Sequence, residues 1–288
     1  MTPLQRLCII GVGLIGGSLA RALRQAQAVD TVVGAGRHTA HLQRAVELGV
    51  IDEFSTDLAV AVGGADMVVI AVPLKAIRPV LTAIAGRLAP EAILTDVGSA
   101  KQCVVDDVRD IFGYLPGTFI PGHPIAGTEC SGVEASFAEL FHNRRVILTP
   151  LLESQAWAHA RVKAMWTLAG AEVIDMGVRH HDDVLAATSH LPHMLAYTLV
   201  DSLARLDSRA EIFRYAAGGF RDFTRIASSD PTMWHDVCVA NREPLLDKLR
   251  QFSHDLEQLT QAIENGDSDS IMQTFQRAKH ARDNLYLD

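Results

Sequence analysis

The chain has 288 residues, of which 48% are hydrophobic and 21% are charged, and its formal net charge is −8. This length exceeds one typical domain and the composition is that of a globular protein with sizeable cores, so we expect two domains. The negative charge argues against nucleic acid or an anionic membrane surface as a partner, although a small anionic substrate can still bind in a locally basic pocket.

The sequence contains no stretch of about 20 apolar residues that could span a bilayer. No long apolar segment precedes the first predicted strand, so we expect no signal peptide. Four cysteines lie far apart and form no Cys-x-x-Cys pair: Cys8, Cys103, Cys130 and Cys238. Their spacing is typical of a reducing compartment and argues against a disulfide framework or a zinc site. We therefore expect a cytoplasmic protein.

Residues 1–176 alternate short β-branched runs with helical patterns. Strands are predicted at residues 7–10, 31–33, 67–71, 93–95, 118–120, 145–148 and 172–175. Helices between several of them are predicted at residues 17–27, 39–48, 75–87 and 154–169. This alternation predicts an α/β, Rossmann-type, dinucleotide-binding domain with a mostly parallel sheet covered on both faces.

Residues 177–288 show no convincing strand pattern and predict an all-α domain. Asp230-Pro231 predicts a helix cap followed by proline at the first helical position. A long helix is expected to end at Asn265-Gly266, and a final helix from about residue 268 carries Ile271, Met272 and Phe275. One apolar stripe runs along the long helix, at Leu245, Leu249, Phe252, Leu256, Leu259 and Ile263. Such a stripe packs either within one subunit or against a second subunit, and the pattern alone does not choose.

The first predicted strand runs directly into the turn Gly11-x-Gly13-x-x-Gly16, and a helical run follows. The first glycine allows a tight turn, the second lets the backbone approach a pyrophosphate, and the third lets helix and strand pack closely. Free N–H groups at the helix start, including those of Leu14 and Ile15, then meet the phosphate charge. The turn therefore predicts a dinucleotide site.

An NAD site usually carries an acidic residue about 20 residues further on, at the end of the second strand. That position falls near Gly36, where no carboxylate is present. Arg37, His38 and Thr39 follow and could hold a 2′-phosphate instead. We therefore favour NADP as the cofactor, with NAD as the alternative.

Two further strand ends carry polar residues, DVGSAK at 96–101 and GHPIAGTE at 122–129. In open parallel sheets, ligands bind outside the carboxyl ends of the strands. A histidine such as His123 can accept a proton from a substrate hydroxyl as hydride leaves the same carbon, and Ser99 could orient it. On its own, His123 could equally be a structural histidine.

The order of the motifs is more specific than any one of them. DVGSAK and GHPIAGTE are followed by SHLPH at 189–193, GGFRDFTR at 218–225 and IASSDPTMW at 226–234. With these motifs the whole chain resembles the prephenate/arogenate dehydrogenase family of tyrosine biosynthesis. The resemblance implies an NAD(P)-dependent oxidative decarboxylation of a cyclohexadienol to a phenol, and a homodimer formed through the helical domains.

The resemblance also implies roles for individual residues. His123 resembles the histidine that contacts the ring hydroxyl and promotes hydride transfer, and Ser99 resembles the serine near it and the nicotinamide. Arg225 resembles the arginine that binds a carboxylate of the dicarboxylate substrate, which suits its forked guanidinium. The expected pocket further contains His193, Glu129, Trp234, His190 and Gly219.

A histidine-rich stretch raises the question of a metal, because His180, His181, Asp182, Asp183, His190 and His193 lie close in sequence. On a helix, His190 and His193 would share a face and could bind a metal. The implied chemistry needs no Lewis acid and no cysteine joins the cluster, so we expect no metal. His181 and Asp182 are expected to help hold the cleft between the domains. For Arg221 and Asp222, pairing with neighbours and contact with substrate remain equally open.

Two other hypotheses remain. A β-hydroxy-acid dehydrogenase of the same domain plan commonly uses a catalytic lysine in its helical domain, whereas the few lysines here lie far along the long helix. A non-catalytic, dimeric NADP(H)-binding module would need neither His123 beside Ser99 nor an arginine in a pocket.

Overall fold

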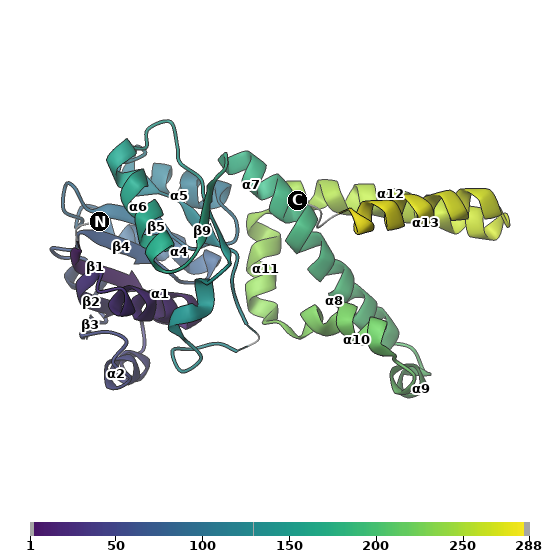
Figure 1. Ribbon diagram of the computed structural model, residues 1–288, viewed down its shortest axis with the longest axis horizontal. Helices are drawn as coiled ribbons and strands as arrows, with labels where there is room; N and C mark the ends of the chain where they lie inside the picture. Colours follow the sequence, from purple (N-terminus) through teal and green to yellow (C-terminus); the bar gives the residue numbers. More distant parts are fainter. Residues whose placement is uncertain (1–2, 129, 285–288) are drawn as a thin grey trace. The chain divides into compact units, whose positions relative to one another are not determined.

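The strands near the N-terminus are short apolar runs whose neighbouring residues point to opposite sides. In the computed structural model, which describes residues 3–128 and 130–284, they form a six-stranded parallel sheet in the order β3-β2-β1-β4-β5-β6 (Figure 1). The bounds are Leu4–Ile10 for β1, Val29–Ala35 for β2, Glu53–Ser55 for β3, Met67–Ile70 for β4, Ile93–Asp96 for β5 and Phe119–Ile120 for β6.

Both faces of this sheet are buried, as the continuous apolar strands predict. Leu7 and Ile9 of β1 belong to one hydrophobic cluster and Cys8 and Ile10 to another, because successive side chains of a strand point to opposite faces. The first cluster includes side chains of α1 and α6, and the second includes side chains of α4 and α5. The helices of this region are α1 (Leu14–Gln25), α2 (Thr39–Glu47), α3 (Leu58–Ala61), α4 (Leu74–Ile84), α5 (Gln102–Phe112), the short 3₁₀ helix η1 (Ala138–Phe141) and α6 (Ala156–Leu168).

A second, smaller sheet follows in the order β7 (Gly122–Pro124), β8 (Arg145–Leu148) and β9 (Glu172–Asp175). Strand β7 runs antiparallel to β8, and β8 runs parallel to β9. The seven predicted strands are confirmed, five of them with shifted ends, but β3 and β7 were not predicted. His123 therefore lies within a strand rather than in a loop after one, because its backbone pairs with that of Ile147.

The chain after β9 is helical in its described part, as predicted. The elements are α7 (Val178–Leu185), the π-helical turn η2 (Ala186–His190), α8 (Leu191–Ala204), α9 (Arg209–Arg214), α10 (Gly218–Thr224), the 3₁₀ helix η3 (Arg225–Ser228), α11 (Pro231–Ala240), α12 (Arg242–Glu264) and α13 (Ser268–Asp283). Asp230 caps α11 by accepting the Thr232 N–H, and Pro231 is the first helical residue, which confirms the predicted start. The long helix ends before Gly266, whose φ of +65° is in the left-handed region.

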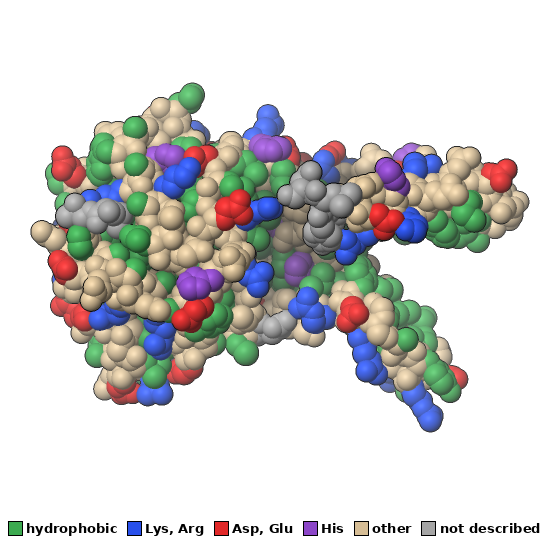
Figure 2. All heavy atoms as spheres, viewed as in Figure 1, with side chains coloured by type: hydrophobic (Ala, Val, Ile, Leu, Met, Phe, Trp, Pro, Cys, Tyr) green, Lys and Arg blue, Asp and Glu red, His purple; other side chains and the backbone are tan. Residues whose placement is uncertain are grey.

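The chain folds into two compact units, residues 1–242 and 243–288. The helices up to α11 thus belong to the same unit as the sheets, while most of α12 and all of α13 form the second unit. Several apolar side chains of this second unit are more than half exposed: Leu256, Ile263, Met272 and Phe275. Figure 2 shows hydrophobic side chains gathered near the turn that joins these two helices. Among the described residues, no helix is both long and apolar enough to cross a membrane.

Candidate active site

The turn between β1 and α1 has the geometry that its glycines predict. Gly11 has a φ of +99°, and a Cβ there would lie 2.3 Å from the carbonyl oxygen of Ala71. A Cβ on Gly16 would lie 2.3 Å from the Gly11 carbonyl oxygen, whereas one on Gly13 would meet no atom within 4 Å. Gly11 and Gly16 are therefore required by packing, and Gly13 borders open space, where the protein backbone can come close to a pyrophosphate.

No side-chain cap binds the first backbone N–H groups of α1. Gly13 is the N-cap residue and supplies no side-chain hydrogen bond, and the first turn, which begins with Leu14 and Ile15, contains no acidic residue. Free N–H groups and the positive end of the helix dipole bind a phosphate well. These residues fit the pyrophosphate of a dinucleotide.

The end of β2 presents a second group of candidate cofactor contacts. The strand ends at Ala35, and Gly36, Arg37, His38 and Thr39 form the connection to α2. The last three are exposed, and within the described part of the chain Arg37 has no hydrogen-bond or ion-pair partner. The first turn of α2 also lacks an acidic residue and a side-chain cap. Residues 36–39 therefore carry one arginine and no carboxylate.

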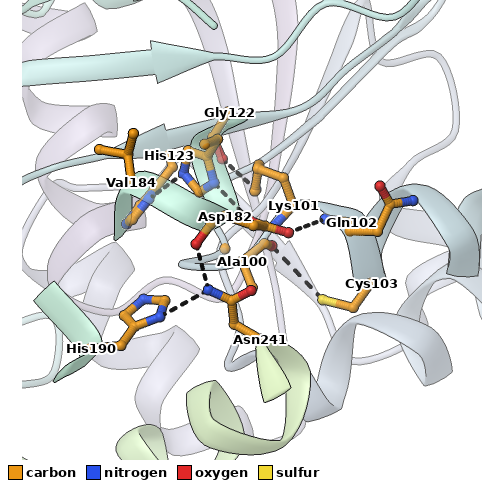
Figure 3. A network of polar contacts seen from close by, with 12 residues as sticks. Ala100, Lys101, Gln102, Cys103, Gly122, His123, Asp182, Val184, His190 and Asn241 are labelled. Carbon is orange, nitrogen blue, oxygen red and sulfur yellow. Dashed lines mark hydrogen bonds and ion pairs between the residues drawn. The ribbon is translucent and has the colours of Figure 1, made fainter. Parts of the chain in front are cut away.

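A buried ion pair joins Asp96, at the end of β5, to Lys101, which lies beside Gly122 in Figure 3. Lys101 and Asp96 are both fully buried and in contact, and the Lys101 ammonium also donates to the carbonyl oxygen of Gly122 at 2.6 Å. The Asp96 carboxylate accepts the Gly98 N–H at 2.8 Å and the Gly122 N–H at 3.3 Å. These contacts fix the loop after β5 against the start of β7, so Ser99 and His123 are held on adjacent segments.

His123 is the first member of a line of three buried side chains. Its Nδ1 lies 2.9 Å from Nε2 of His181, and Nδ1 of His181 lies 2.8 Å from the Asp182 carboxylate. The same carboxylate accepts the backbone N–H groups of Lys101 at 2.8 Å and Gln102 at 2.9 Å, at the start of α5. Sequence reasoning assigned the orientation of His123 to Ser99. In the structure the contact is made by His181, and Ser99 makes no side-chain hydrogen bond to the described residues.

The electrostatics of this line follow from burial. Burial, together with the fields of His181, Lys101 and His190, holds the pKa of His123 well below its usual 6.5. Burial also lowers the pKa of His181, although its hydrogen bond to Asp182 opposes the shift. Burial raises the pKa of the Asp182 carboxyl, but hydrogen bonds from His181, Gln102 and Lys101 outweigh it and the net shift is downward. At neutral pH both histidines are therefore neutral and Asp182 is ionised.

A second group of side chains lies on α8, α11 and the turn before α8. The ring of His193 stacks on Trp234 with centroids 3.6 Å apart, and the ring of His190 meets the same indole edge-on at 6.1 Å. Asn241 donates its amide to Nδ1 of His190 at 3.0 Å and to the backbone carbonyl of Asp182 at 2.8 Å. Burial lowers the pKa of His190 to about 4. The Nδ1 of His193 donates to the Ser189 carbonyl at 2.8 Å.

The structure brings most of the predicted substrate residues together. His190 is close enough to act electrostatically on His123, and Arg225 acts in the same way on His193. Arg225 begins η3 and is exposed, while Gly219 lies on α10, which packs on α8. Among the residues that the structure describes, no hydrogen bond joins Gly219 to His190, His193 or Trp234, and Glu129 lies outside these residues. Within those residues, no three His, Cys, Asp or Glu side chains are arranged to hold a metal ion.

Sequence reasoning missed two residues of this site. Lys101 belongs to the DVGSAK motif, but no role was assigned to it. The acidic residue Asp96 at the end of the strand in the same motif could have indicated a buried partner for this lysine. Asn241 was not identified at all, because one asparagine after a helix is a common way to end a helix. Its contact with His190 depends on the packing of α11 against the turn before α8.

A glycine-rich phosphate turn and a buried, neutral histidine are the features expected of an NAD(P)-dependent dehydrogenase, and comparison with known proteins agrees. Residues 19–175 match the family model described as prephenate dehydrogenase, nucleotide-binding domain, and residues 178–277 match prephenate dehydrogenase, dimerization domain. The chain belongs to the prephenate dehydrogenase family. It is an oxidoreductase that catalyses an oxidative decarboxylation in tyrosine biosynthesis.

Relatives cover nearly the whole chain. A cyclohexadienyl dehydrogenase from Zymomonas mobilis is 40% identical, with 100% of this chain and 98% of the relative covered. A prephenate dehydrogenase from Bacillus subtilis is 34% identical, with 98% and 76% covered. The crystal structure of Aquifex aeolicus prephenate dehydrogenase with hydroxyphenyl propionate and NAD+ has a TM-score of 0.90 at 35% identity, with 98% of each chain covered. Of the three hypotheses drawn from the sequence, these findings support the dehydrogenase of cyclohexadienols.

Proposed function

We propose that this chain oxidises prephenate, arogenate or both, with His123 as the proton acceptor. The observation that carries the proposal is a buried histidine, neutral at neutral pH, whose Nδ1 is held at 2.9 Å by His181. A neutral imidazole can take the proton of the ring hydroxyl while hydride leaves the same carbon and CO2 departs from the ring. The ring becomes aromatic in that step, so the site has to supply positioning and one base.

Four further residues are proposed to position the substrate. Arg225 holds a carboxylate, because a guanidinium offers a fork of donors matched to that group. His193 and Trp234 stack on each other within the electrostatic range of Arg225, and His190 meets Trp234 edge-on and lies within the electrostatic range of His123. Glu129 and Gly219 complete the proposed pocket. Ser99 stays a proposed neighbour of His123 and the nicotinamide.

The proposed cofactor is NADP, with NAD as the alternative. Gly11, Gly13 and Gly16, with the first N–H groups of α1, hold the pyrophosphate. Arg37, His38 and Thr39 hold the 2′-phosphate, which is supported by the arginine and the lack of a carboxylate at residues 36–39. When bound, the nicotinamide accepts the hydride.

The proposed assembly is a homodimer formed through the helical domain. The match to a dimerization domain supports it, as do the exposed apolar side chains of Leu256, Ile263, Met272 and Phe275. We propose residues 1–176 as the dinucleotide-binding domain and residues 177–288 as the substrate-binding and dimerisation domain. We also propose a cytoplasmic location, because four free cysteines are typical of a reducing compartment.

A steady-state assay of both substrates against both cofactors tests the proposal. We expect reduction of NADP by at least one substrate, with a higher kcat/KM for NADP than for NAD that Arg37→Ala reverses. Tight cofactor binding without turnover of either substrate would refute the proposed reaction. A preference for NAD that Arg37→Ala leaves unchanged would refute the NADP assignment alone.

Two variants test the proposed roles. His123→Asn is expected to lower kcat roughly 100-fold or more while substrate binding persists, as the loss of a general base implies. Arg225→Ala is expected mainly to raise KM. The matched control is His180→Gln on α7, because His180 is exposed and two residues from Asp182. Unchanged turnover in His123→Asn would remove His123 from the chemistry, and an unchanged KM in Arg225→Ala would remove the carboxylate role.

A further inference from the structure

The three side chains from His123 to Asp182 carry a defined pattern of donors and acceptors. An ionised carboxylate can only accept hydrogen bonds, and a neutral imidazole has one N–H donor and one acceptor nitrogen. Asp182 is ionised, because its hydrogen bonds lower its pKa. Nδ1 of His181 lies 2.8 Å from that carboxylate, so Nδ1 must carry the proton of His181. Nε2 of His181 is then an acceptor.

The tautomer of His123 follows from this first assignment. Its Nδ1 lies 2.9 Å from Nε2 of His181, and two acceptor nitrogens at that distance would repel each other. Nδ1 of His123 must therefore be the donor, which leaves Nε2 as the acceptor of the neutral ring. Within the described residues Nε2 of His123 makes no hydrogen bond, so its lone pair is available to a ligand.

The opposite pattern is unfavourable for a reason that the structure makes plain. If Nδ1 of His123 were the acceptor, Nε2–H of His181 would have to donate to it. A neutral His181 would then place the lone pair of its Nδ1 against the Asp182 carboxylate, in a fully buried position. A doubly protonated His181 would avoid that clash, but burial lowers the pKa of His181 and favours the neutral ring.

We propose that His181 and Asp182 are positioning residues that hold His123 in the tautomer with its proton on Nδ1, so that Nε2 faces the substrate as the base. The inference rests on the proposed role of His123 as proton acceptor. When Nε2 takes the proton of the substrate hydroxyl, the new imidazolium keeps its Nδ1 proton. Its Nδ1–H continues to donate a hydrogen bond to Nε2 of His181. The proton stays on His123, and the charge of Asp182 stabilises the cation through the intervening ring.

Asp182 has a second contact that ties this line to the loop carrying Ser99. Its carboxylate caps the start of α5 by accepting the N–H groups of Lys101 and Gln102, about 80 residues earlier in the chain. One carboxylate therefore sets both the proton position of His181 and the position of the segment that follows Ser99. Asn241 holds the backbone of Asp182 from the end of α11. The line is anchored at its far end by three separate backbone contacts.

The direct test reads the tautomer in the intact enzyme. Full-length protein labelled with ¹⁵N-histidine gives imidazole nitrogen shifts and two-bond N–H couplings that distinguish an Nδ1 proton from an Nε2 proton. His123→Asn identifies the His123 signals by their loss. We expect Nδ1 of His123 to be protonated at pH 7.5, and protonation at Nε2 would overturn the inference. This reading does not depend on turnover, so it stands apart from the outcome of the activity assays.

Two substitutions at His181 separate the hydrogen bond from mere packing. His181→Gln places an amide so that its NH2 meets Asp182 and its oxygen accepts from Nδ1 of His123, although it lacks the ring. His181→Phe keeps the ring and lacks the acceptor. If the hydrogen bond matters, the Gln variant retains the Nδ1 proton and most of kcat. The Phe variant loses the Nδ1 preference, and its kcat falls roughly 10- to 100-fold with KM changed less than about twofold.

The opposite ranking, with Phe active and Gln inactive, would show that His181 only fills space. Equal losses in two folded variants, or a Phe variant that keeps the Nδ1 proton, would also overturn the inference. His180→Gln on the same helix is the control and is expected to match the wild type in both readings. If His123→Asn keeps its turnover while the Nδ1 proton is observed, the proposed function fails and the tautomer assignment survives.

Discussion

The buried pair of Lys101 and Asp96 gives the largest stability effect that the structure predicts. Lys101→Met keeps the length of the side chain and removes the ammonium group, which leaves a fully buried carboxylate without its counter-charge. The Gly122 carbonyl oxygen also loses a donor at 2.6 Å. Removing one partner of a buried pair costs about 3–5 kcal/mol. Two backbone N–H groups still bind Asp96, so we expect no more than this range.

The assay is equilibrium unfolding in urea at one protein concentration, since association adds to the apparent stability. A loss of about 3–5 kcal/mol corresponds to a fall in Tm of roughly 6–20 °C for a chain of this size class. The control is Arg145→Met, because Arg145 pairs with Glu172 at 3.4 Å with both side chains more than 60% exposed. That pair should contribute less than about 1 kcal/mol.

A double variant tests whether the cost of Lys101→Met comes from the unpaired buried charge. Asp96→Asn combined with Lys101→Met removes both charges, so it should recover part of the stability that Lys101→Met alone loses. If Lys101→Met costs no more than Arg145→Met, or if the double variant shows simple additivity, the buried charge is not what makes this position sensitive.

Three further outcomes are expected. Burial and nearby charges lower the pKa of His123, so its base form persists below pH 6.5. The value of kcat/KM should therefore stay level from pH 7.5 to about 6. A pH profile of kcat/KM with its midpoint at the ordinary 6.5 would contradict this. His190, with a pKa of about 4 when folded and 6.5 when unfolded, takes up its proton first in the unfolded state. The free energy of unfolding should therefore fall as the pH drops from about 6.5 to 4, and His190→Asn should flatten that decline in urea titrations; parallel curves would refute the assignment. Ile263→Asp should shift the protein from dimer to monomer in light scattering, whereas Gln261→Asp on the same helix should not.

The features that the sequence could predict depend on interactions between residues close together in the chain. The glycine turn was recognisable because Gly11, Gly13 and Gly16 have backbone requirements that their neighbours make plain. The cap at Asp230-Pro231 and the apolar stripe of α12 depend on contacts within a few residues, so the pattern reports them directly. The same is true of the buried strands on either side of the turn, although their ends shifted by up to three residues.

The hydrogen-bonded line of His123, His181 and Asp182 forms only in the tertiary structure. His123 meets His181 58 residues away, and the Asp182 carboxylate caps a helix about 80 residues earlier in the chain. No local period encodes such distances, and β7 exists only because β8 offers it a pairing edge. The sequence therefore determined that the chain has a dinucleotide turn and a candidate catalytic histidine. The packing of α7 against α5 decided which of its nitrogens carries the proton, because that choice depends on a carboxylate that only the folded chain brings into place.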